Sequence, residues 1–85
     1  MSELLPDRAT ELKNAEAERV NLVVNGETRC LPAGTTLAQL LETLQLDPRT
    51  LAVELNRDVV PRGRHAQCVL QEGDRLEIVT LVGGG

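Results

Sequence analysis

The chain has 85 residues, a formal net charge of −4 at pH 7 and a sequence pI near 4.9. It contains no Phe, Tyr or Trp, so it lacks the aromatic platforms on which bases stack, and its acidity disfavours contact with phosphate backbones. No apolar run approaches the length that spans a bilayer. We therefore expect one small domain that binds neither nucleic acid nor membrane.

Cys30 and Cys68 lie far apart, and the sequence has a single histidine, His65. This spacing supports neither a disulfide framework nor a metal site. Two reduced thiols, together with an N-terminal segment that lacks the pattern of a signal peptide, predict a cytoplasmic protein.

Residues 1–18 are rich in charged side chains and alanine, and their apolar face is too thin to dock firmly. We expect a disordered or weakly helical extension, with a partner-docking helix as the alternative. Residues 19–82 are expected to form the domain, followed by a flexible glycine tail at 83–85.

The domain begins with a strand at 19–24, in which Val20, Leu22 and Val24 share one face. Asn25-Gly26 then supplies two residues that tolerate positive φ, the strongest short-range signal for a hairpin turn. Residues 27–31 are therefore expected to return as the second strand, which Pro32 and Gly34 interrupt.

Thr36 and Gln39 have the spacing of a capping box. One stripe of leucines follows at helical spacing and predicts a helix packed on the core: Leu37, Leu40, Leu41 and Leu44. Asp47 before Pro48 ends this helix and is expected to cap a new turn.

The second half of the chain predicts a strand at 51–55, a turn at 56–58 and a short edge strand at 59–60 that stops at Pro61. A polar loop at 62–65, a return to the core at 68–70, a turn at 72–74 and a last strand at 75–82 complete the order. One helix covers one face of a sheet. The pattern therefore predicts an α+β fold of the β-grasp type, a mixed four- to five-stranded sheet curled over one main helix.

The sequence ends in three glycines, Gly83, Gly84 and Gly85. Glycines cost entropy to order and carry no side chain, so such a tail suits a narrow channel. Fully extended, residues 81–85 reach roughly 16 Å. The only reactive group that this tail carries is the terminal carboxylate of Gly85.

These motifs together resemble the ubiquitin-like sulfur carriers, and within them the ThiS family of thiamine biosynthesis. The resemblance covers residues 20–85 and rests on the segments 24–26, 36–41, 53–56, 59–62, 72–79 and 82–85. It does not extend to residues 1–18, whose role it leaves open.

The resemblance implies a carrier that binds no cofactor itself and acts as a co-substrate, not as an enzyme. A ThiF-type adenylyltransferase would use ATP and magnesium to adenylate Gly85, and a sulfur donor system would convert the adenylate to a thiocarboxylate. A ThiG-type thiazole synthase would then receive the sulfur. Gly83 and Gly84 would thread the tail through the partners' active sites.

Candidates for contact with these partners lie near the tail exit: Val60, Pro61, Leu81 and Val82. The alternative is that they are ordinary core or edge residues. Arg57, Arg62 and Arg64 form either a small basic patch or a solvated surface without a role.

Two related functions remain open, a small subunit of molybdopterin synthase and a ubiquitin-like protein modifier. An enzyme would have to use His65 and Cys68, but the sequence suggests no third group to orient the pair. Cys68 lies in an apolar triplet, where a buried thiol is the expected role. We therefore expect no catalytic residue and no metal ligand in the chain.

Overall fold

The computed structural model describes residues 18–81. The predictions for residues 1–17 and for the tail at 82–85 lie outside this range. The elements are β1 (Arg19–Val24), β2 (Glu27–Pro32), α2 (Leu37–Thr43), the 3-10 helix η1 (Pro48–Thr50), β3 (Leu51–Leu55), β4 (Asp58–Val59), the 3-10 helix η2 (Arg62–Gln67) and β5 (Arg75–Thr80). No helix within 18–81 is long and apolar enough to cross a membrane.

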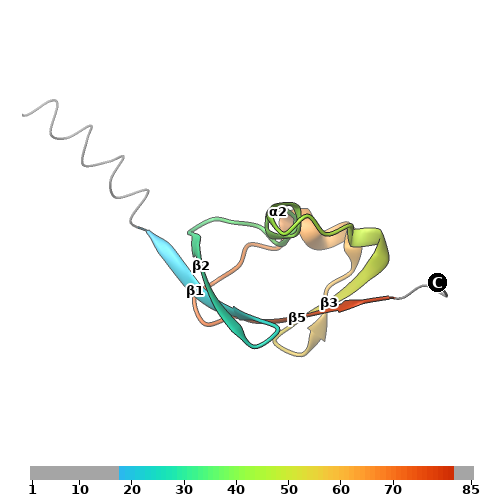
Figure 1. The fold of residues 1–85 in the computed structure, drawn as a ribbon. Coiled ribbons are helices and arrows are strands. Elements are labelled where there is room, and N and C mark those ends of the chain that lie inside the picture. Colours follow the sequence, from blue (N-terminus) through green and yellow to red (C-terminus); the bar gives the residue numbers. More distant parts are fainter. Residues whose placement is uncertain (1–17, 82–85) are drawn as a thin grey trace, which may run out of the picture.

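The five strands form one mixed sheet in the order β2-β1-β5-β3-β4. β5 lies parallel to β1 and antiparallel to β3, and the two outer pairs are antiparallel. Figure 1 shows α2 and η2 over the same face of this sheet. The predicted α+β fold of the β-grasp type, with one main helix, is confirmed.

The first hairpin turns at Asn25 and Gly26, whose φ angles are 49° and 85°. Positive φ at both central residues is what a type I′ turn requires, and it matches the right-handed twist of the paired strands. The Asn-Gly signal therefore located this turn correctly.

Both hydrogen bonds of the capping box at the start of α2 are present. Thr36 Oγ1 accepts a hydrogen bond from the Gln39 amide at 3.1 Å, and Gln39 Oε1 accepts one from the Thr36 amide at 2.9 Å.

The leucine stripe of α2 points into a core that is entirely aliphatic: Leu22, Val24, Leu37, Leu40, Leu41, Leu51, Val53, Leu70 and Leu76 are buried. Leu44, the last of the stripe, is half-buried against this core as the C-cap of the helix.

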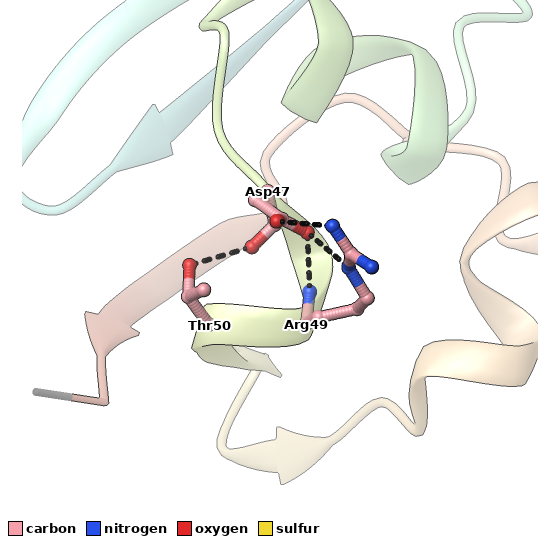
Figure 2. Close-up of polar contacts among 3 residues, drawn as sticks. All are labelled: Asp47, Arg49 and Thr50. Carbon is pink, nitrogen blue, oxygen red and sulfur yellow. Dashed lines mark hydrogen bonds and ion pairs between the residues drawn. The ribbon is translucent and has the colours of Figure 1, made fainter. Parts of the chain in front are cut away.

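Asp47 caps η1 and turns the chain from α2 into β3, as Figure 2 shows. Its carboxylate accepts hydrogen bonds from the Arg49 amide at 2.9 Å and from the Arg49 guanidinium at 3.1 and 3.0 Å. The Asp47 carbonyl accepts the amide and hydroxyl of Thr50 at 2.9 and 2.8 Å. The side-chain and backbone hydrogen bonds from Arg49 lower the pKa of the Asp47 carboxyl.

Several segments differ from the prediction. β4 comprises Asp58–Val59, and Val60 instead packs against the core, its amide donating to the Val53 carbonyl at 2.9 Å. The segment predicted as a polar loop at 62–65 forms η2, in which His65 is buried. The sequence there has no apolar period, so its order depends on contact with α2, which periodicity does not reveal. β5 ends at Thr80, two residues before the predicted end.

Candidate functional site

β5 and Leu81 are the last described part of the chain before the glycine tail. β5 pairs with β3 along its length, from Leu55↔Leu76 to Leu51↔Thr80. One residue further, the Leu81 amide donates to the Thr50 carbonyl at 2.7 Å. Thr50 is in turn hydrogen-bonded to Asp47 (Figure 2). Leu81, which we call the root of the tail, is therefore attached to the turn that follows α2.

On the side of β5 that faces β1, the Asn25 side chain holds β5 beyond the point where the two strands stop pairing. β1 pairs with β5 only at Val23↔Arg75 and Val24↔Leu76. Beyond this, the Asn25 side chain donates to the Ile78 carbonyl at 3.1 Å and accepts from the Ile78 amide at 2.7 Å. Asn25 thus forms the hairpin turn and also extends the sheet as a short substitute for a strand.

A second asparagine fixes the start of β5. Asn56, in the β3–β4 turn with a φ of 52°, accepts the Arg75 amide at 3.0 Å and donates to Asp74 at 3.0 Å. Asp74 is buried and also accepts the Gln71 amide at 2.8 Å. Sequence reasoning placed both asparagines in turns but missed their links to β5. One sequence carries no signal for contacts made by side chains across such separations.

The sheet face opposite α2 carries no element among residues 18–81, as Figure 1 shows. We call its outward residues on three strands the open face: Ala52 and Glu54 of β3, Val59 of β4, and Glu77 and Val79 of β5, with Leu81 after β5. Cross-strand register sets their neighbours, because Glu54 lies opposite both Val59 and Glu77, and Ala52 lies opposite Val79. Val59, Val79 and Leu81 are 66%, 54% and 53% exposed.

The structure separates the predicted partner-binding residues. Leu81 lies on the open face at the root of the tail, whereas Val60 is half-buried against the core and Pro61 is exposed beside it. Val60 and Pro61 line a groove of about 300 Å³ with Cys68. Leu81 is hydrogen-bonded to Thr50 and Val60 to Val53, so these two residues are roughly 10 Å apart along β3. Val82 lies outside the described residues, as do Gly83, Gly84 and Gly85.

The three predicted basic residues are exposed on the β3–β4 turn and on η2. Within residues 18–81, the ion pairs are Arg29–Glu27 and Arg49–Asp47, and neither involves Arg57, Arg62 or Arg64. Arg62 borders a cavity of about 260 Å³ between α2 and η2. The structure therefore shows solvated charges at these positions and no ion pair that would order them.

His65 and Cys68 do not form an activated pair. His65 Nε2 lies 3.1 Å from the Val60 carbonyl, and its buried Nδ1 has no partner in residues 18–81. Burial, with a smaller effect of the Asp74 charge, raises the pKa of the Cys68 thiol. A nucleophilic cysteine needs the opposite shift. The described residues also contain no group of three or more His, Cys, Asp or Glu side chains placed to hold a metal ion.

Comparisons with known proteins agree on one family. The family model described as the ThiS family matches residues 22–85. The chain is 30% identical over 66 residues to the sulfur carrier protein ThiS of Escherichia coli, covering 78% of this chain and 100% of that protein. A crystal structure of the thiamine biosynthesis protein ThiS from Geobacter metallireducens matches with a TM-score of 0.68 at 29% identity, again covering 78% and 100% of the two chains.

Longer proteins also match. A thiazole synthase of Paramagnetospirillum magneticum is 46% identical over 66 residues, and one of Magnetococcus marinus is 48% identical over 62 residues. These matches cover 78% and 73% of this chain but only 20% and 19% of the two thiazole synthases. The chain therefore spans about a fifth of the length of these relatives.

Proposed function

The chain belongs to the ThiS family, and from this premise we propose that it carries sulfur for thiazole formation in thiamine biosynthesis. The observation that carries the proposal is a match that includes the three terminal glycines and extends over the whole length of a named sulfur carrier. The geometry adds a reason. Leu81 follows β5 and directly precedes the last four residues of the chain, and its amide is hydrogen-bonded to the Thr50 carbonyl.

The proposed chemistry takes place at the carboxylate of Gly85. A partner adenylyltransferase of the ThiF type would let one carboxylate oxygen attack the α-phosphorus of magnesium-bound ATP, releasing pyrophosphate. A sulfide-level sulfur nucleophile from a donor system would then attack the acyl carbon and expel AMP, leaving a thiocarboxylate. Transfer of this sulfur into the product of thiazole synthase would exchange it at the acyl carbon for one oxygen, supplied by the substrate or by water, and so restore the carboxylate for the next cycle.

In this proposal the chain is a co-substrate of its partners and supplies no acid, base or metal. Its contribution is positional, because the sheet holds the root of the tail while Gly83 and Gly84 enter the partner's active site. Thiazole synthase is supported as one partner by the two longer relatives of that name, each of which contains a segment like this chain. Free Cys30 and Cys68 suit a reducing cytoplasm.

The test is the intact mass of the purified chain after incubation with ATP, magnesium, cysteine and a lysate of its own host. We expect the mass change of one sulfur replacing one oxygen, located in the C-terminal peptide. A ladder of larger conjugates without this change would contradict the proposal and favour a protein modifier. Activity with molybdopterin precursors alone would favour the other sulfur-carrier family.

A matched variant lacks only Gly85. We expect its urea unfolding midpoint to equal that of the parent chain, while formation of the thiocarboxylate falls to background. Normal sulfur loading of this variant would show that the reactive carboxylate is not specific to Gly85.

A further inference from the structure

We propose that the open face is the docking surface for thiazole synthase, and that a basic side chain of that enzyme binds between Glu54 and Glu77. The inference rests on the proposed function and adds to it the chemistry by which the partner is recognised. It follows from the exposed apolar side chains, from one pair of like charges, and from the position of this face beside the tail.

The apolar part of the argument is the composition of this face. Val59, Val79 and Leu81 are each more than half exposed, and they belong to three segments that the sheet brings onto one side. Apolar side chains scattered singly over a surface are normal, whereas apolar groups gathered on one face mark interaction sites. Figure 1 shows no described element over this face of the sheet.

The charged part is the pair Glu54 and Glu77, which stand directly opposite each other in the antiparallel pairing of β3 and β5. Like charges at such positions repel and destabilise the isolated sheet. Within residues 18–81 neither glutamate forms an ion pair. Arg75 lies two residues before Glu77 on the same face, and within residues 18–81 it forms no ion pair either.

A basic side chain placed between the two carboxylates would remove their repulsion and gain charge-assisted hydrogen bonds. Arginine suits this position best, because its planar guanidinium presents donors to two acceptors at once. The complementary surface is therefore a basic centre flanked by apolar side chains that contact Val59 on one side and Val79 with Leu81 on the other.

The position of the face beside the tail, together with the two longer relatives, supports thiazole synthase as the occupant. Leu81 is the last described residue and is bonded to Thr50, and an enzyme that receives the tail must approach from beyond it. Two thiazole synthases contain a segment similar to this chain within one polypeptide, so this enzyme works beside a domain of this kind. Leu81 itself belongs to the open face, so this face borders that approach.

The experiment measures binding of the full chain to thiazole synthase of the same organism by titration calorimetry. The test variant carries Glu54→Gln and Glu77→Gln. The control carries Glu27→Gln and Glu42→Gln, which change the net charge equally on β2 and α2, away from the open face. We expect the test variant to bind about tenfold more weakly or worse, and the control to bind as the parent does. Added salt should weaken binding of the parent more than binding of the test variant.

Folding is checked separately, because removing the repulsion predicts a urea midpoint for the test variant equal to or above that of the parent. Equal affinity of the test variant and the parent would overturn the inference, as would equal losses in test and control. A parent chain that forms the thiocarboxylate but binds thiazole synthase independently of this face would refute the inference alone. A chain that never forms the thiocarboxylate would refute the proposed function instead.

Discussion

Replacing Asn25 with glycine tests the dual role of this residue in the turn and in the sheet. Glycine adopts the positive φ that the turn needs, so the substitution isolates the loss of the side-chain amide. That amide makes two hydrogen bonds to the backbone of Ile78, at 3.1 and 2.7 Å. We therefore expect the hairpin to persist while β5 loses its support beyond Leu76.

The magnitude follows from those two bonds. A typical hydrogen bond contributes roughly 0.5–1.5 kcal/mol net, which gives about 1–3 kcal/mol for the pair. Both bonds lie at the surface, so water can replace the amide at Ile78. We accordingly expect the lower part of this range, about 1–2 kcal/mol of unfolding free energy. With a urea dependence near 1 kcal/mol per molar for so small a domain, the midpoint should fall by about 1–2 M.

Urea unfolding followed by far-ultraviolet circular dichroism is the suitable assay, because the chain has no Trp or Tyr to report by fluorescence. Hydrogen exchange at the Ile78 amide adds a local reading, and its protection should fall in the variant. Thr28→Ala, at an exposed position of β2, is the control and should leave both unchanged. An Asn25→Gly midpoint equal to that of the parent, with Ile78 still protected, would refute the assigned role.

Three further outcomes are expected. Leu41→Ala should cost roughly 2–5 kcal/mol in the same titration, because the side chain is buried in the core, and a change near zero would contradict that burial. Asp47 has a folded-state pKa below its usual 3.8, so its contribution to stability is present above that value and is lost as the pH falls through the lowered pKa. Asp47→Asn should therefore flatten the acid side of the stability profile, and an unchanged profile would argue against the Arg49 contact. Iodoacetamide should modify exposed Cys30 before Cys68, whose pKa is raised by burial, and peptide mass spectra that show the reverse order would exclude this assignment.

The features that the sequence predicted correctly are those that local residue chemistry determines. Asn25-Gly26 fixed the hairpin because few residues accept positive φ, and the spacing of Thr36 and Gln39 located the start of α2. The leucine stripe identified the buried side of the helix, since helical period and burial are linked directly. From these elements a single mixed sheet curled over one helix followed, because a single helix can cover only one face.

The features that it missed depend on which segments become neighbours. The bond between Asn25 and Ile78 spans 53 residues, and an asparagine in a turn gives no sign of a distant partner. His65 was expected in a polar loop, yet η2 folds over the core and buries its ring. The pairing of Glu54 with Glu77 likewise depends on the register of β3 with β5, which the pattern of one strand does not specify.

The hydrogen bond from Leu81 to Thr50 has a consequence for how such a chain can vary in evolution and in design. It gives the tail a fixed origin, so each added or removed glycine shifts the terminal carbon by about 3.5 Å. Reacting groups must be placed to within roughly 0.5 Å. For an extended tail, a change of one residue therefore moves the terminal carbon much further than the precision with which the reacting groups must be placed. One extra residue after Leu81 should therefore misplace the sulfur.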